Sequence, residues 1–368
     1  MTGALEKEIR LSFASRIRGT LPAPYRPLIS ETKEEDSPPF KYDTDTTPYS
    51  PQGKEVLRLL RTKAADSTLN TPLTTIENLA SEHGVIDPLI PSTDAFVTAI
   101  CHLGAKSLSH VLSQIEARRE RLTAIGPVSE PARRQIITSV MDYWHEKPGV
   151  GVNIIDKLLN YTILTPQSVI LWALGDVLGR GESLTQAHIY EMVASTVTKV
   201  STRVRQIVMA RNAPGLPADQ RVILEETLSK ELEEMRNLFG IIVDMVVGVA
   251  EGSNDAMAEG REGEGDALQV WGEKWGRVFR RKLAVEDSWV GEMIAVGDGV
   301  REAEEENGIV EEVAMGEAGV GTAGEEGVAE AGARNGGGDV NGNGREARAG
   351  KKRKLVEEEE EDMVVDIL

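Results

Sequence analysis

Apolar residues along this chain recur at steps of three and four positions, which is the spacing of one face of an α-helix. The pattern is clearest in residues 188–247, where two such series flank the short proline- and glycine-rich segment 213–217. The first series is Ile189, Val193, Val197, Val200, Val204 and Ile207, and the second is Leu224, Leu228, Leu232, Met235, Phe239 and Ile242. Two long helices joined by so short a turn predict an antiparallel hairpin.

Shorter amphipathic segments fill residues 52–177, and we expect Pro72, Pro148 and Pro166 to lie at helix starts, where the missing N–H costs least. A closing helix is predicted over 268–293, and strict alternation of the kind seen in strands is absent. The predicted fold class is therefore all-α. Consecutive helix pairs of this length favour an α-solenoid of stacked helical hairpins, HEAT/armadillo-like, although no repeat is exact.

The amino-terminal part divides differently. Residues 4–18 place apolar side chains four apart on one short helix, which must pack on something else. Seven prolines follow between residues 22 and 51, and they predict an extended linker over 20–51. The solenoid domain is expected over 52–297.

Charge is spread unevenly over the 368 residues, whose formal net charge is −19. Residues 298–368 hold 20 acidic and 8 basic residues, 14 of the 36 glycines and no aromatic residue. Such a segment has too little apolar surface to offset the entropy of ordering, so a disordered acidic tail is predicted over 298–368. Within it, Lys351, Lys352, Arg353 and Lys354 match a nuclear-import signal, although chance matches are common in charged tails.

The sequence offers little catalytic chemistry. None of the five histidines has metal-binding spacing, and the single cysteine, Cys101, lies among apolar residues and is expected to be buried. The glycine-rich strings lack the pattern of a phosphate-binding loop. The most apolar run, 239–250, is too short to cross a membrane. We predict no enzyme, no cofactor and no metal site.

Two polar features remain as candidate sites. The first is a corner in which Lys106, Ser107 and His110 interrupt an apolar pattern; hydroxyls that cap a helix would explain it equally well. The second is a basic cluster formed by Arg118, Arg119, Arg121, Arg133 and Arg134. It fits a solvated helix face, a surface for an acidic partner, or a surface for the RNA backbone.

Several longer runs together resemble the large subunits of nuclear cap-binding complexes. They are EIRLSFASRIRGTLP (8–22), FKYDTD (40–45), GKEVLRLLRTKA (53–64), DAFVTAICHLGAKSLSHVLSQIEARRERL (94–122), VMDYWHEKPGVGVNIIDKLLNYTILTPQSVILWAL (140–174) and RNLFGIIVDMVV (236–247). The resemblance extends over residues 5–293, and the tail resembles nothing in the family.

The resemblance implies three helical domains of the kind found in the middle of translation initiation factor 4G. Residues 1–19 would be the last helix of the second domain, and residues 52–297 the third domain with its long hairpin. Most of the first two domains would be missing, so the chain is either a fragment or a genuine short form. The family's usual import signal would be missing too, which draws attention to Lys351–Lys354.

In this family a small subunit with an RNA-recognition motif stacks the 7-methylguanosine cap, and the large subunit orders it and recruits splicing, export and decay factors. The resemblance therefore implies a nuclear scaffold that meets capped RNA only through its partner, with shuttling to the cytoplasm left open. Lys106, Ser107, His110, Arg118, Arg119 and Arg121 are its candidate partner surface. The alternative is direct RNA binding by the cluster Arg118–Arg134, which the acidic net charge disfavours.

Overall fold

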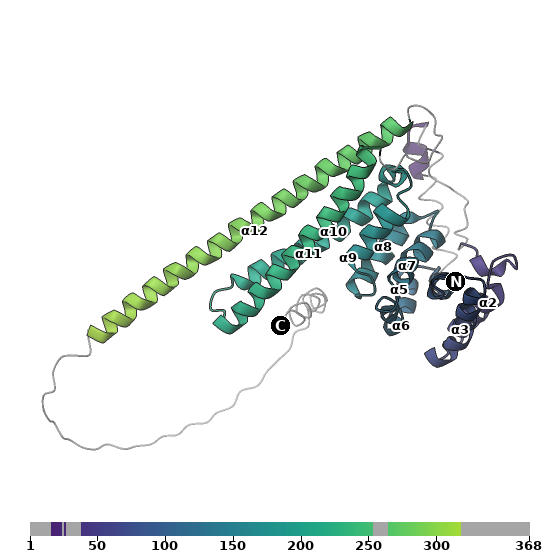
Figure 1. The fold of residues 1–368 in the computed structure, drawn as a ribbon, viewed down its shortest axis with the longest axis horizontal. Coiled ribbons are helices and arrows are strands. Elements are labelled where there is room, and N and C mark those ends of the chain that lie inside the picture. The colour runs from purple at the N-terminus through teal and green to yellow at the C-terminus, as the bar shows by residue number, and fades with distance from the viewer. Residues whose placement is uncertain (1–15, 24–25, 27–37, 253–263, 318–368) are drawn as a thin grey trace, which may run out of the picture. The chain divides into compact units, whose positions relative to one another are not determined.

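The computed structural model describes residues 16–23, 26, 38–252 and 264–317, and within 264–266 and 304–317 it describes the helix but not the side chains (Figure 1). In these ranges all regular structure is helical, which confirms the predicted all-α fold. The elements are η2 (Lys41–Asp43), α2 (Ser50–Arg61), α3 (Asp66–Glu82), α4 (Leu89–Gly104), α5 (Leu108–Glu116), α6 (Arg119–Ile125), α7 (Glu130–Tyr143), α8 (Pro148–Asn160), α9 (Pro166–Leu171), η3 (Trp172–Asp176), η4 (Glu182–Thr185), α10 (Ala187–Arg211), α11 (Ala218–Ala250) and α12 (Glu264–Glu317).

Helix α4 is the centre of the first half of the domain. It contacts α2, α3, α5 and α7, and its residues from Ser92 to Cys101 are all buried. Phe96 and Ile100 are among the most completely buried large side chains of the described residues. Helix α4 begins at Leu89, so the polar residues Ser92 and Thr93 lie inside the helix and do not cap it.

The same central helix holds a buried carboxylate, Asp94, whose side chain is 10% exposed. Its oxygens accept hydrogen bonds from Lys41 Nζ (2.6 Å), Tyr42 Oη (2.6 Å) and Ser139 Oγ (2.7 Å). These donors come from η2 and α7, so Asp94 joins three parts of the chain. A buried carboxylate is tolerated when its lone pairs are satisfied in this way.

The predicted linker over 20–51 needs correction at its end. Phe40 and Tyr42 are each only 2% exposed, and the ring of Tyr42 lies directly against Gly53 of α2. Burial of two aromatic side chains outweighs the cost of ordering a short proline-flanked segment. Residues 38–51 therefore belong to the helical domain, and residues 24–25 and 27–37 lie outside the described ranges.

Two of the three expected proline starts are confirmed, since Pro148 and Pro166 are the first residues of α8 and α9. Pro72 instead lies inside α3, six residues after its start at Asp66. Proline is costly there because it cannot donate a hydrogen bond. The neighbouring Leu69, Leu73 and Ile76 are at most 3% exposed, and their burial offsets that cost.

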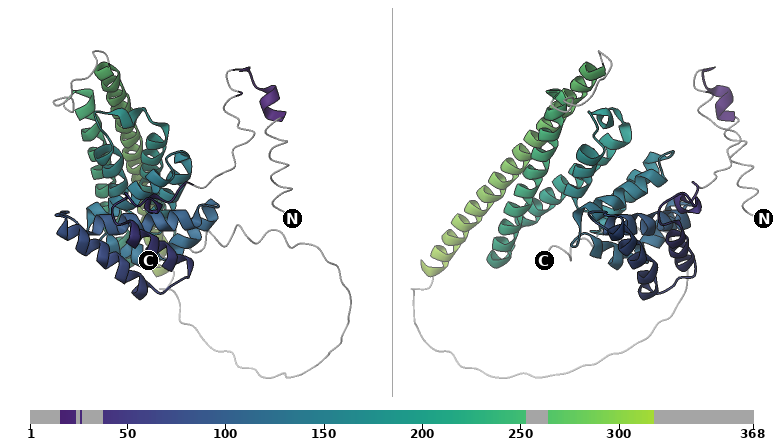
Figure 2. Two further views of the ribbon diagram at one scale, coloured as in Figure 1. Left: turned by 90° about the vertical axis from the view of Figure 1, so that its right-hand side faces the viewer. Right: turned by 45° about the vertical axis from the view of Figure 1, so that its right-hand side comes forward.

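The predicted hairpin is confirmed: α10 and α11 contact each other along their length and run antiparallel (Figures 1 and 2). Helix α12 then lies along α11. A Cβ on Gly272 would come within 2.7 Å of the backbone nitrogen of Ala250, so only glycine permits this close approach. Farther along, Trp275 Nε1 donates to the carbonyl of Leu184 (3.1 Å).

Helix α12 continues to Glu317, past residue 297, where the sequence placed the start of the acidic tail. Residues 298–317 contain no proline and seven glutamates, a residue that favours helix, so this stretch can form a helix although it has little apolar surface to bury. The tail from 318 onward, including Lys351–Lys354, lies outside the described residues. No described helix has a segment long and apolar enough to span a bilayer.

Candidate partner-binding surfaces

The polar corner between α4 and α5 is a helix cap. Ser107 has extended backbone angles, its Oγ accepts the backbone N–H of His110 (3.3 Å), and it lies 2.7 Å from His110 Nδ1. Just before it, a Cβ on Gly104 would clash with the backbone of Val111, so glycine permits the tight turn. Lys106, Ser107 and His110 are all exposed, as a surface for a partner requires.

Two arginines of the predicted basic cluster fasten α5 and α6 to α3. Arg118 donates to Asp66 Oδ1 (2.5 Å) and to the carbonyl of Ala64 (2.8 Å), and its side chain is only 14% exposed. Arg121 donates from both terminal nitrogens to Asn70 Oδ1 (2.8 and 2.7 Å). The local role of both side chains is therefore to join helices.

Of the other three arginines, Arg119 begins α6 while Arg133 and Arg134 lie on α7, and each has a different neighbour. Arg133 pairs with Glu130 (3.0 Å) and Arg134 with Asp176 (2.7 Å). Arg119 lies over the ring of Tyr161, 5.4 Å from its centroid, and it alone of the five is exposed. The structure thus does not gather the cluster into one open basic face.

The environment of Arg121 is unusual for a cation. Burial lowers the pKa of its guanidinium, and Asp66 and Glu77 act in the opposite direction. The ring of Phe96 lies 5.5 Å from the guanidinium carbon. Within the described part of the chain, no carboxylate lies within ion-pair distance of Arg121. By contrast, Arg118, Arg133 and Arg134 each pair with a carboxylate.

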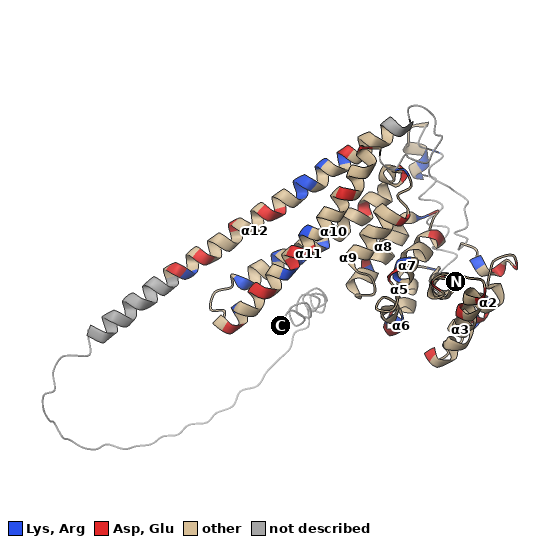
Figure 3. Cartoon of the chain, viewed as in Figure 1, with Lys and Arg blue, Asp and Glu red and all other residues tan. Residues whose placement is uncertain are grey.

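A second concave surface, the hairpin groove, lies between α9 and the α10–α11 hairpin and has a volume of about 1090 Å³. Its charges are balanced. The basic residues are Arg133, Arg203, Lys230 and Arg236, and the acidic residues are Glu130, Glu231, Glu234 and Asp244. Figure 3 shows this interleaving of blue and red residues along α10 and α11.

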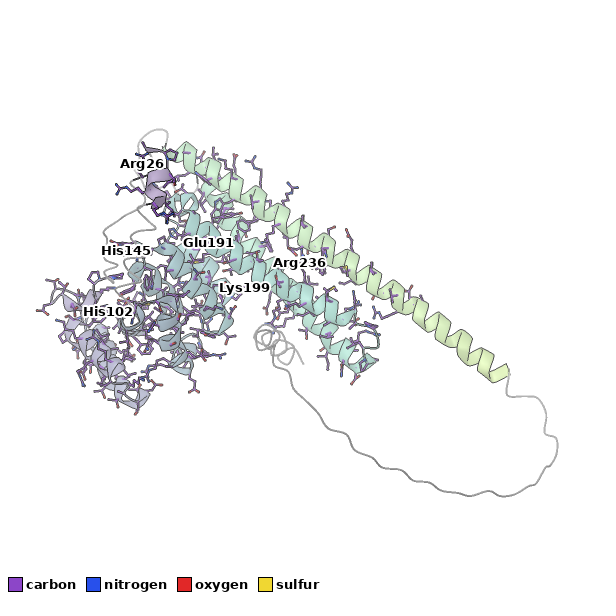
Figure 4. The ribbon with its side chains drawn as sticks, turned by 180° about the vertical axis from the view of Figure 1, so that it is seen from behind. Arg26, His102, His145, Glu191, Lys199 and Arg236 are labelled. Atoms are coloured by element: carbon purple, nitrogen blue, oxygen red, sulfur yellow. The ribbon has the colours of Figure 1, made fainter. Side chains whose placement is uncertain are left out.

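Ion pairs hold the hairpin on both sides. Figure 4 labels Lys199 on α10 and Arg236 on α11. Lys199 contacts Asp156 of α8 (3.2 Å), and Arg236 contacts Asp287 of α12 (3.0 Å). These ion pairs connect the hairpin to α8 and to α12, and Arg236 also lines the groove. Sequence reasoning missed it because its residues come from segments more than a hundred positions apart, and no local pattern connects them.

Among the described residues, no group of three or more His, Cys, Asp or Glu side chains is placed to hold a metal ion. Cys101 is 1% exposed, as expected from its apolar neighbours. Burial raises the pKa of its thiol to about 12, so the nucleophilic thiolate is scarce at neutral pH.

Comparison with known proteins agrees with this architecture. A family model described as MIF4G like matches residues 40–288, a range that begins at the buried Phe40 and ends within α12. Proteins named "Nuclear cap-binding protein subunit 1" are similar to the chain: that of Schizosaccharomyces pombe is 25% identical over 233 residues, covering 63% of this chain and 27% of the relative.

The corresponding protein of Xenopus tropicalis is 26% identical over 211 residues, and that of Homo sapiens is 24% identical over 211 residues. Each alignment covers 55% of this chain and 26% of the relative, so the chain spans about a quarter of the length of these proteins. The resemblance to cap-binding large subunits expected from the sequence is confirmed by these relatives. Because the matching model extends over well more than half of the residues, the chain belongs to the MIF4G-like family.

Proposed function

We propose that this chain is a non-catalytic scaffold of a nuclear cap-binding complex and that it binds and orders a small subunit with an RNA-recognition motif. The observation that carries the proposal is the family match over 40–288 together with relatives named as nuclear cap-binding subunits. Capped RNA would be held by the small subunit, and the scaffold would support mRNA processing, splicing, export and nonsense-mediated decay.

The partner surface that we propose is the corner and the adjoining helix, formed by Lys106, Ser107, His110, Arg118, Arg119 and Arg121. Lys106 and Arg119 are its informative cations, because both are exposed and neither joins two helices through an ion pair among the described residues. Replacing Arg118 with an acidic residue would break its hydrogen bonds to Asp66 and to the carbonyl of Ala64. A loss of binding by that variant could then result from misfolding as well as from a lost contact with the partner.

The test is binding of the full chain to the purified small subunit, measured by calorimetry. The double variant Lys106→Glu/Arg119→Glu should weaken binding at least tenfold, and its salt dependence should become shallower. The matched control Arg277→Glu/Arg280→Glu changes net charge equally on exposed residues of α12 and should bind normally. Normal binding by the first variant would remove this surface, and no binding by the unaltered chain would contradict the scaffold proposal.

RNA-binding measurements on the same purified chain distinguish this proposal from direct RNA binding by the cluster Arg118–Arg134. Without the small subunit, the chain should bind capped and uncapped RNA equally weakly at physiological salt. Tight, steeply salt-dependent binding of both RNAs would favour the alternative. Arg118, Arg121, Arg133 and Arg134 already contact groups of this chain, which leaves little open basic surface for an RNA backbone.

Nuclear location would depend on an import receptor that recognises Lys351, Lys352, Arg353 and Lys354. Replacing all four residues with alanine in a fluorescent fusion should move the signal from the nucleus to the cytoplasm. Replacing Arg334, Arg345 and Arg348, which are basic but dispersed in the same tail, is the control and should leave the nuclear signal in place. A nuclear signal that survives the fourfold alanine variant would exclude this motif.

A further inference from the structure

A small pocket lies beside α3, α4 and α6, and we refer to it as the Phe96 pocket. Its volume is about 260 Å³, several times the ~30 Å³ that one water molecule occupies in the liquid. Its apolar lining comes from Leu73, Leu89, Phe96, Ala124, Ile125 and Val128. The space and lining suit a bulky apolar side chain.

One wall of the pocket carries an unsatisfied polar atom. Thr93 is 2% exposed, lines the pocket, and its Oγ1 has no hydrogen-bond partner. A buried hydroxyl without a partner costs about 1–3 kcal/mol. Other threonines inside long helices, such as Thr196 and Thr198, bond a backbone carbonyl four residues earlier. The Thr93 oxygen has almost no accessible surface, so it marks a local cost of burial beside the pocket and is not a ready contact for a ligand.

The pocket also presents a cation. Arg121 lines it, is half-buried, and lacks a carboxylate partner among the described residues. Glu77, across the pocket, is already engaged as an acceptor for Ser92 Oγ (2.8 Å). The terminal nitrogens of Arg121 now donate to the neutral amide of Asn70, so a carboxylate arriving with a ligand would be the first anion to pair directly with this guanidinium among the described residues.

The rim of the pocket is apolar and held in place. Val128, which lines the pocket, is 77% exposed, and Ile86, in the loop before α4 but outside the lining, is fully exposed. A hydrogen bond from Ser129 Oγ to Asp87 Oδ2 ties the two loops together. Exposed apolar side chains around a concave site are typical of protein interaction surfaces.

We propose that the Phe96 pocket is a second docking site that takes a short peptide segment of a partner protein. An apolar side chain of the peptide fills the pocket, and a carboxylate one or two residues away pairs with Arg121. This site goes beyond the proposed scaffold function, because it requires neither the small subunit nor RNA.

The probe is a phage-displayed library of random twelve-residue peptides, selected on the full chain. Enriched peptides should share Leu, Ile, Met or Phe within two positions of Asp or Glu, and a fluorescein-labelled copy of the most enriched one is then titrated by anisotropy. Ala124→Leu, an exposed position that fills the pocket, should weaken binding at least tenfold. The control Ala117→Leu, exposed at the end of α5, should leave it unchanged.

Two further variants guard against loss of folding and test the charge. Val128→Lys changes only an exposed rim residue and should also weaken binding, while the thermal unfolding of every variant is monitored. Selection on Arg121→Glu should switch the preference from acidic to basic neighbours. The absence of the shared motif, or equal binding by Ala124→Leu, would overturn the proposal. Self-association that Ala124→Leu abolishes would assign the pocket to a second copy of the chain and overturn it as well.

Discussion

Replacing Asp94 with alanine should lower the free energy of unfolding by about 3 kcal/mol at neutral pH. The substitution removes the carboxylate that accepts hydrogen bonds from Lys41, Tyr42 and Ser139. The hydroxyls of Tyr42 and Ser139 are buried, and both lose this acceptor. Chemical denaturation measures the change. The control Asp45→Ala removes a carboxylate of the neighbouring segment that is exposed and pairs only with Lys54, and it should leave stability nearly unchanged.

The effect of Asp94→Ala should also depend on pH. Burial alone would raise the pKa of Asp94, but the Lys41 ammonium and the hydrogen bonds from Lys41, Tyr42 and Ser139 outweigh it and hold the pKa below its ordinary value. The folded state therefore binds this proton less readily than the unfolded state. The stabilisation is complete above the ordinary aspartate pKa near 4 and is lost as the pH falls through the lower folded value.

Denaturation at several pH values between 2 and 7 tests this linkage. The difference in stability between the unaltered chain and Asp94→Ala should be largest near neutrality and should shrink in the acid range. A difference that stays constant with pH would show that Asp94 contributes through packing and not through its charge.

Replacing Arg211 with methionine should cost about 1–2 kcal/mol and release α12 from the end of the hairpin. The Arg211 side chain is 8% exposed, and its Nη2 lies 2.9 Å from Glu225 Oε1 on α11 and 2.8 Å from Asp298 Oδ1 on α12. Methionine keeps the length of the side chain but removes these hydrogen bonds, and the two carboxylates keep only Arg301 as a cationic partner among the described residues. The next residue, Asn212, adds a hydrogen bond from Nδ2 to the carbonyl of Met293 (2.6 Å).

Hydrogen exchange along α12 distinguishes a local from a global effect. In Arg211→Met, amides around Asp298 should lose protection more than those around Trp275, whose contact with Leu184 lies at the other end. Arg203→Met is the control, because that side chain is 63% exposed and makes a surface pair with Glu231. Uniform loss of protection over the whole helix would contradict a local role for Arg211.

The parts of the fold that follow from local chemistry were predictable. The hairpin of α10 and α11 is encoded by its apolar spacing and by the Pro-Gly turn, and Pro148 and Pro166 begin α8 and α9 as expected of proline at a first helical position. The packing of Phe40 and Tyr42 was not predictable, because nearby prolines indicated a linker and the compensating contact, Asp94, lies about fifty residues away.

The same distinction applies to the candidate sites. The cap at Ser107 involves residues three positions apart, and the sequence suggested it. The partner of Arg118 is Asp66, 52 positions earlier, so a count of basic residues along 118–134 could not reveal that most of this charge is engaged in tertiary contacts. The residues that line the hairpin groove come from several helices, and so do those of the Phe96 pocket. No local sequence pattern within one segment therefore predicts either of them.

The packing of η2 has a practical consequence for anyone who dissects this protein. Tyr143 Oη donates to the carbonyl of Pro38 (3.1 Å), and Lys41 and Tyr42 follow immediately as donors to Asp94. A truncated version that starts at the first long helix, Ser50, would lack these groups and expose the interior of α4 to solvent. The shortest self-sufficient unit for expression and binding studies begins no later than Pro38, twelve residues ahead of where helix boundaries alone would make the cut.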